Sequence, residues 1–217
     1  MDAETRRSAL WASWLLIVGA ILSWIGAFSP LVLMPGGELD ASPEELLRFA
    51  DSHHLGWFAL NGGFLLGVLI TALGFTALTV MFRHTGEHLL SEFGLVCYLF
   101  GATFWVMYLA FRLTLLLSAA RETVATGLVP SYFSPLKLWL GFLFAIHSVL
   151  AYLSVAVYGV AVLRTELLPK WLGRACILFS LFVLVSFLAG AEALPLLIHV
   201  MPFITGVLLL RRVSIPR

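Results

Sequence analysis

Hydrophobic residues occur along the chain in six long runs, and charged and turn-forming residues are confined to the segments between them. A transmembrane helix needs about 20 mostly apolar residues to cross a hydrocarbon core of roughly 30 Å. Membrane-spanning β-strands are only about 10 residues long and alternate in polarity. The pattern therefore predicts an all-α, polytopic bundle of six transmembrane helices, at residues 10–33, 55–82, 93–117, 136–163, 171–189 and 194–210.

Composition agrees with this prediction. Of the 217 residues, 61% are hydrophobic and 12% are charged, whereas soluble domains have about 45–50% apolar and about 25% charged residues. Six spans use up the length, so we expect a single membrane domain over residues 1–217. The first run is longer than the apolar part of a secretory signal, which has about 7–15 residues, and we interpret it as a retained span.

The distribution of Lys and Arg predicts the orientation of the bundle, because positive residues accumulate on the cytoplasmic side. With both termini in the cytoplasm, the outer segments hold only Arg48, Arg121 and Lys137. The cytoplasmic segments then hold Arg6, Arg7, Arg83, Arg164, Lys170, Arg174, Arg211, Arg212 and Arg217. Aromatic residues expected at the two interfaces agree with this orientation: Trp11, Trp14 and Trp171 at cytoplasmic ends, and Trp57, Tyr132 and Trp139 at outer ends.

The first outer loop contains the signature of a short helix. Ser42-Pro43-Glu44-Glu45 provides an N-cap, a proline at the first helical position and a capping-box glutamate. The apolar residues Leu46, Phe49 and Ala50 share one face of this helix. We expect a short amphipathic helix that lies on the membrane surface and leans over the outer mouth of the bundle.

Small residues recur at intervals of four in three of the runs. Such stripes let helix backbones approach closely in lipid, either within one chain or between chains. The stripes are Gly19, Ser23 and Ala27; Gly63, Gly67 and Thr71; and Gly141 and Ala145.

Polar groups inside the spans are the candidates for function, because an ionisable residue at the centre of a span costs at least about 2.5–3.5 kcal/mol. Counted from the ends of the runs at about 1.5 Å per residue, Asn61, Arg112 and His199 lie roughly 8–9 Å below the outer boundary, and His147 lies near the midplane. Tyr108 is one turn from Arg112, and Glu192 lies in the turn before the sixth span. We expect one outer-half pocket, with ligand-binding residues Arg112, His147, His199, Asn61, Tyr108 and Glu192, close to His53 and His54.

Cofactor chemistry is not indicated by any diagnostic spacing, and the cofactor stays unknown. His147 and His199 are the intramembrane pair that could ligate haem, but their expected depths differ by roughly 9 Å. A metal held by His53, His54, Glu192 and His199 has suitable ligand types without a motif. The segment from His84 to His88 matches the H-x-x-E-H pattern of inverted zinc peptidases, but it occupies a short loop with a glycine in its middle. Cys97 and Cys176 lie in apolar runs and are expected to be reduced, packed thiols.

The turn between the fourth and fifth spans, Val162-Leu163-Arg164-Thr165-Glu166-Leu167-Leu168-Pro169-Lys170-Trp171-Leu172-Gly173-Arg174, carries a resemblance. It is similar to a phrase in small six-span bacterial membrane proteins grouped as a domain of unknown function. The resemblance implies a bacterial plasma membrane and brings no catalytic residues.

These observations favour an integral membrane protein that binds a small apolar or amphipathic ligand, such as a lipid or a quinone, in the outer-half pocket. One alternative is an intramembrane oxidoreductase or lipid-modifying enzyme that uses the same residues, so enzymatic activity stays open. Another is a structural subunit of a membrane complex or a homo-oligomer. The net charge of +1 and the scattered basic residues argue against nucleic acid as a partner. A transporter is disfavoured because the sequence shows no internal repeat.

Overall fold

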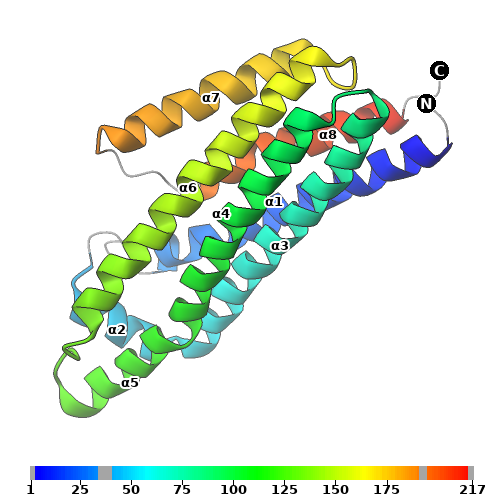
Figure 1. Ribbon diagram of the computed structural model, residues 1–217. Helices are drawn as coiled ribbons and strands as arrows, with labels where there is room; N and C mark the ends of the chain where they lie inside the picture. Colours follow the sequence, from blue (N-terminus) through cyan, green and yellow to red (C-terminus); the bar gives the residue numbers. More distant parts are fainter. Residues whose placement is uncertain (1–2, 34–40, 191–194, 215–217) are drawn as a thin grey trace.

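The computed structural model describes residues 3–33, 41–190 and 195–214. Within these ranges the chain forms helices and no strands, and six helices are long and apolar enough to cross a membrane (Figure 1). The prediction of an all-α, multi-pass membrane protein is therefore confirmed. The helices are α1 (Ala3–Leu33), α2 (Pro43–Ser52), α3 (His54–His84), α4 (Leu89–Leu113), α5 (Leu115–Thr126), α6 (Phe133–Arg164), α7 (Lys170–Leu188), the 3-10 helix η1 (Pro195–His199) and α8 (Val200–Ser214).

The spanning helices pack in a chain of neighbours. α1 lies along α3 on one side and along α8 on the other, α4 packs on both α3 and α6, and α7 lies along α6. Both termini lie at the same end of the molecule, next to the α3–α4 and α6–α7 turns. We call this the terminal end and the opposite one the lobe end.

Close backbone crossings join α1 to α3 and α6 to α7. A Cβ on Gly67 would lie 2.5 Å from Ser23 Oγ and 2.8 Å from the carbonyl oxygen of Gly19. A Cβ on Gly173 would lie 2.6 Å from the carbonyl oxygen of Gly159. Small residues are therefore required at both crossings, because any side chain would force two backbones apart.

The predicted stripes take part in these crossings unequally. Gly19, Ser23, Gly67 and Thr71 meet at the α1–α3 crossing, whereas a Cβ on Gly63 or Gly141 would find nothing within 4 Å. The expectation that Gly63 and Gly141 lie at helix–helix contacts is wrong within this chain, since no described residue lies close to either one. The Gly159–Gly173 pair was missed because its partners come from two different runs.

The short helix α2 is present with the predicted start. Ser42 N–H donates to Glu45 Oε2 (2.8 Å), and Glu45 N–H donates to Ser42 Oγ (3.3 Å), which completes the capping box. Bonding from the side chain and backbone of Ser42 holds the pKa of the exposed Glu45 carboxyl below its ordinary value of 4.5.

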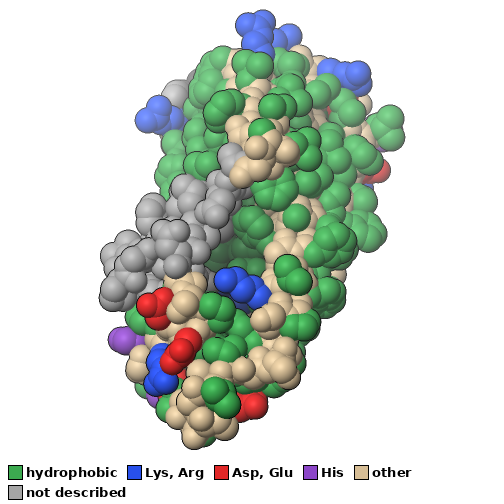
Figure 2. All heavy atoms as spheres, turned by 90° about the vertical axis from the view of Figure 1, so that its left-hand side faces the viewer, with side chains coloured by type: hydrophobic (Ala, Val, Ile, Leu, Met, Phe, Trp, Pro, Cys, Tyr) green, Lys and Arg blue, Asp and Glu red, His purple; other side chains and the backbone are tan. Residues whose placement is uncertain are grey.

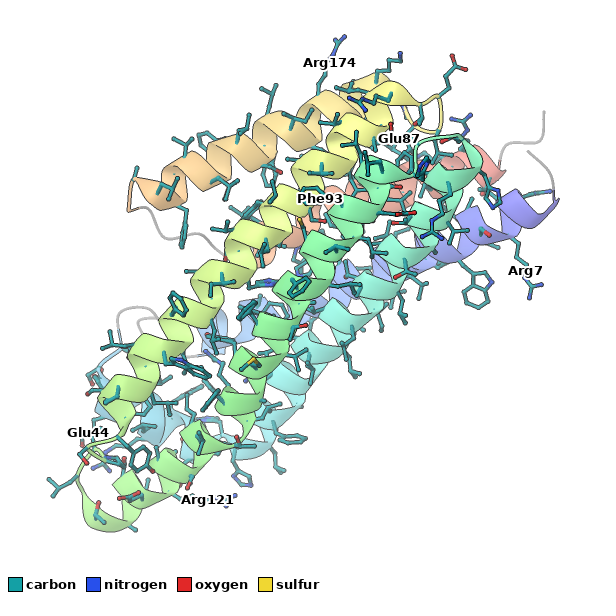
Figure 3. All side chains as sticks on the ribbon, viewed as in Figure 1. Arg7, Glu44, Glu87, Phe93, Arg121 and Arg174 are labelled. Carbon is teal, nitrogen blue, oxygen red and sulfur yellow. The ribbon has the colours of Figure 1, made fainter. Side chains whose placement is uncertain are left out.

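The predicted role of α2 as a surface helix with its apolar face on the membrane is wrong. That face is buried in a small hydrophobic core with α5 and the first turns of α3 and α6, formed by Leu46, Leu47, Ala50, Trp57, Leu116, Ala119, Ala120 and Phe133. We call this unit the lobe. It exposes charged side chains such as Arg48, and Glu44 and Arg121, which Figure 3 labels. Such charges favour water over hydrocarbon. The helix α2 therefore packs on protein and not on lipid.

The third predicted span runs across a helix break. α4 ends at Leu113, and α5 begins at Leu115 after Thr114, whose φ of −120° and ψ of −76° are not helical. The apolar run 93–117 hides this break because the first residues of α5 are leucines that enter the core of the lobe. The other five runs correspond to α1, α3, α6, α7 and η1–α8.

Charged side chains lie at both ends of the molecule. In the view of Figure 2, Lys and Arg occur at the terminal end and near the lobe, and most of the acidic side chains in view lie at the lobe. At the terminal end, Arg83 pairs with Glu92 (3.0 Å) and Arg164 with Glu87 (3.7 Å). Glu87 Oε1 also accepts from the Leu90 N–H at the start of α4 (3.2 Å). The glutamate of the H-x-x-E-H segment thus acts as a helix cap and an ion-pair partner.

Candidate functional site

Arg112 is the centre of a polar and aromatic cluster where α3 and α4 meet the lobe. Its Nε donates to Asn61 Oδ1 (2.8 Å), and one terminal nitrogen donates to Tyr108 Oη (3.0 Å). The guanidinium carbon lies 4.4 Å from the centre of the Trp57 ring and 5.6 Å from that of Tyr108. Arg112 is only 7% exposed and Asn61 only 4%, so the charge is held by hydrogen bonds and two aromatic faces.

Trp57 and Asn61 lock the cluster to the backbone. Trp57 Nε1 donates to the carbonyl oxygen of Arg112 (3.0 Å), at the end of α4 where carbonyls lack helical partners. Asn61 Nδ2 donates to the carbonyl oxygen of Trp57 (2.8 Å), one turn back along α3. Trp57 is therefore a buried member of the cluster, and its prediction as a lipid-interface residue is wrong.

Asn61 and Arg112 lie at matching distances from the α3–α4 turn. At 1.5 Å per residue, about 35 Å of helix separates Arg112 from Leu89, and about 35 Å separates Asn61 from His84. The two side chains therefore meet at the same level of the bundle. Their predicted depth of roughly 8–9 Å below the outer boundary stays a prediction.

His147 and His199 lie in a second layer, at the level of Trp105, which is about two turns before Arg112 on α4. The Trp105 ring stacks on His147 (4.6 Å between centroids) and on Tyr108 (4.6 Å), which links this layer to the Arg112 cluster. Phe64 lies edge-on to Trp105 at 4.9 Å and to His199 at 6.1 Å. We call Phe64, Trp105, His147 and His199 the aromatic layer.

The two histidines differ in how they are satisfied. The carbonyl oxygen of Gly101 accepts a hydrogen bond from His147 Nδ1 (2.9 Å), so Nδ1 carries the proton and Nε2 of the neutral ring is an acceptor. His199 is 1% exposed, and neither of its ring nitrogens has a hydrogen-bond partner among the residues that the structure describes. The predicted difference in depth between the two rings stays a prediction, while Phe64 and Trp105 link the two rings.

Three more buried polar atoms, on Trp105 of the aromatic layer and on two residues of α6, also lack a hydrogen-bond partner among the residues described. Trp105 Nε1, Ser148 Oγ and Tyr152 Oη are buried and have no partner within the described ranges. Ser148 follows His147 on α6, and Tyr152 is one turn further along it. Tyr152 shares a small core with Ile198, the neighbour of His199.

The structure thus brings together five of the predicted residues in two linked groups: Asn61, Tyr108 and Arg112, then His147 and His199 through Trp105 and Phe64. Glu192 and Arg217 lie outside the described residues. His53 and His54 are exposed at the α2–α3 junction, where His53 stacks on Phe49 at 4.4 Å, and they are not part of either group. No group of three or more His, Cys, Asp or Glu that could hold a metal ion occurs in the described part of the chain.

Sequence reasoning missed Trp105 and Phe64, which connect the polar residues. In the sequence both look like ordinary apolar residues of a span. Trp105 lies one turn before Tyr108 and two turns before Arg112 on α4, and this spacing could have indicated that the three side chains share one face of the helix. The chain matches no family model, no curated protein and no solved structure. The resemblance of the turn at residues 162–174 to small six-span bacterial proteins therefore carries no family assignment.

Proposed function

We propose that the protein binds a small apolar or amphipathic molecule, such as a lipid or a quinone, in the lobe-side half of the membrane. The aromatic layer would hold the polar head of this ligand, and Arg112 with Asn61 and Tyr108 would close the site toward the lobe.

The proposal rests on the two buried ring nitrogens of His199, which lack hydrogen-bond partners in the described ranges. An unsatisfied buried donor or acceptor costs about 1–3 kcal/mol, and native proteins leave few such groups without a partner. A neutral imidazole has one donor and one acceptor, and both are buried here without a partner in the described ranges. A ligand head with a carbonyl or hydroxyl group would satisfy them.

Three other buried polar atoms without a described partner, on α4 and α6, support the same ligand chemistry. Trp105 Nε1 is a donor, and Ser148 and Tyr152 can donate or accept, so a head with an oxygen acceptor suits the layer. Phe64 and Trp105 offer aromatic surface to an apolar body. A planar carbonyl compound such as a quinone, or the ester region of a lipid, combines both features.

The orientation is proposed from charge. The terminal end holds most of the Lys and Arg residues, and the positive-inside rule assigns it to the cytoplasm. The lobe and the site then face the opposite side. The resemblance of the α6–α7 turn supports a bacterial plasma membrane.

Ligand retention tests the proposal. Full-length protein purified in a mild detergent would be extracted with organic solvent, and the extract compared by mass spectrometry with that of the His199→Phe variant. We expect wild-type protein to retain a stoichiometric amphipathic compound and the variant to retain about ten-fold less, since one hydrogen bond contributes about 1–1.5 kcal/mol. The control is His84→Phe, which makes the same change at an exposed site at the terminal end.

Equal retention by the two variants, or no retained compound in wild-type protein, would overturn the proposal. A Soret band in the absorption spectrum would replace the lipid-like ligand with haem. A change in the mass of the ligand during incubation would favour the alternative, an intramembrane oxidoreductase or lipid-modifying enzyme.

A further inference from the structure

A second site, independent of the aromatic layer, lies at the terminal end where α8 meets the α6–α7 turn. A surface cavity of about 410 Å³ opens there, lined by Thr165, Glu166, Leu168, Pro169, Lys170, Leu208 and Arg212. Its volume falls within the roughly 300–1,000 Å³ of small-molecule sites. The lining combines two cations with a leucine wall.

Arg212 is fixed in the cavity by the backbone of the turn. One of its terminal nitrogens donates to the carbonyl oxygens of Glu166 (2.6 Å) and Leu167 (2.5 Å). An arginine has five N–H donors, and the remaining three have no partner in the described part of the chain. The guanidinium is therefore held in place with donors left for a ligand.

The start of α7 adds further donors to the same cavity. α7 begins at Lys170 after Pro169, which makes no side-chain cap. The first N–H groups of a helix lack intrahelical partners and carry a partial positive charge. Here the Leu172 N–H bonds the carbonyl oxygen of Pro169 (2.9 Å), which leaves the N–H groups of Lys170 and Trp171. The Lys170 ammonium, the Arg212 guanidinium and this helix start together favour an anionic group, and the single carboxylate in the lining, Glu166, is outnumbered.

The position and the apolar wall select a lipid as the source of the anion. Leu168 and Leu208 line the cavity, and Trp171, 54% exposed next to Lys170, is typical of the level of the lipid headgroups. Beyond the cavity, α7 exposes Leu178, Leu181, Phe182 and Val185, and it packs along α6 and not closely along α8 (Figure 1). A lipid with its headgroup in the cavity can therefore lay an acyl chain on α7.

We infer that this cavity binds an anionic phospholipid through its phosphate, with Lys170 and Arg212 as the recognising cations. Basic pockets between transmembrane helices bind anionic headgroups by this chemistry. Such a lipid would add a link between α8 and α7, whose main contacts in the described part of the chain are with α6.

Native mass spectrometry of the full-length protein tests the inference, with phosphatidylglycerol and phosphatidylcholine as the added lipids. We expect wild-type protein to favour phosphatidylglycerol, and Lys170→Gln to bind it about five-fold more weakly, as expected for one basic residue near a membrane surface. The matched control is Arg211→Gln, which removes the same charge from a neighbouring exposed residue that does not line the cavity. Equal losses in Lys170→Gln and Arg211→Gln would overturn the inference, because they would indicate general attraction to the basic end.

A variant that blocks the cavity distinguishes binding in the cavity from attraction by charge alone. Leu208→Trp fills the cavity without a change in charge, and we expect it to weaken phosphatidylglycerol binding at least as much as Lys170→Gln. Unchanged binding in Leu208→Trp would contradict a lipid in this cavity. Displacement of the lipid by millimolar inorganic phosphate would overturn the choice of a lipid and indicate a site for a free anion. Retention of the ligand of the aromatic layer is a separate readout, so the two proposals can fail independently.

Discussion

Asn61 bonds directly to the buried guanidinium of Arg112. In Asn61→Ala, the Nε–H of Arg112 loses its acceptor at 2.8 Å, and the carbonyl oxygen of Trp57 loses its donor at 2.8 Å. A hydrogen bond to a charged group contributes about 1.5–3 kcal/mol and a neutral one about 1 kcal/mol. We expect the free energy of unfolding to fall by about 3 kcal/mol, because the other contacts of Arg112 remain.

Thermal unfolding in detergent measures this change. For a chain of 150–250 residues, about 1 kcal/mol shifts Tm by roughly 2–4 °C, so we expect a decrease of about 6–12 °C. The control is Asn61→Asp, which keeps an acceptor for Arg112 and loses only the bond to Trp57, and its Tm should lie closer to that of the wild type. A decrease below about 2 °C for Asn61→Ala would refute the reasoning, since the guanidinium would then be solvated without Asn61.

Three further predictions follow from contacts elsewhere. Gly67→Ala places a Cβ 2.5 Å from Ser23 Oγ and should lower the free energy of unfolding by about 1–3 kcal/mol. The added Cβ of Gly63→Ala meets no neighbour, so the free energy of unfolding should stay unchanged or rise by up to about 1 kcal/mol. A larger decrease in Tm for Gly63→Ala than for Gly67→Ala would contradict the close α1–α3 crossing. Tyr158→Phe removes the buried bond between Tyr158 Oη and Thr79 Oγ1 (2.6 Å) and should lower the free energy of unfolding by about 1 kcal/mol. Its Tm should fall more than that of Tyr132→Phe, which removes only an exposed bond to Glu122 (2.9 Å). The Glu45 carboxyl should titrate below 4.5 by carbon NMR. The stabilisation from the capping box is therefore complete above the pKa of Glu45 in the unfolded chain and is lost as pH falls through its lowered pKa in the folded chain. In Ser42→Ala the titration midpoint of Glu45 should rise, and an unchanged midpoint would contradict the capping contribution.

The sequence was sufficient for the six spans because each run is long, apolar and bounded by charge. It was also sufficient for α2, since the capping box and the proline act locally. It could not predict that α2 packs on α5, because the break at Thr114 lies inside an apolar run and the residues that form the core of the lobe look like the residues of a span.

The candidate site was predictable in its polar members and not in its geometry. Arg112, Asn61 and the histidines stand out as costly groups in apolar runs. The contacts could not be predicted because the first turns of α3 and α6 pack with α2 and α5 in the lobe. The roles of Trp57 and Trp105 depend on which face of each helix meets another, and hydrophobicity alone does not distinguish a ring on lipid from a ring on a guanidinium.

The packing of α8 along α1 has a consequence for how the protein is assembled. A Cβ on Gly206 would lie 2.9 Å from the carbonyl oxygen of Ser13, so the last described span completes the burial of the first. During synthesis this face of α1 lacks its protein partner until about 190 further residues have been added. At 5–20 residues per second this takes roughly 10–40 s. Final closure of the bundle is therefore a late event that joins the segments most distant in sequence, and a ribosome that stalls before α8 leaves an open bundle for quality control to recognise.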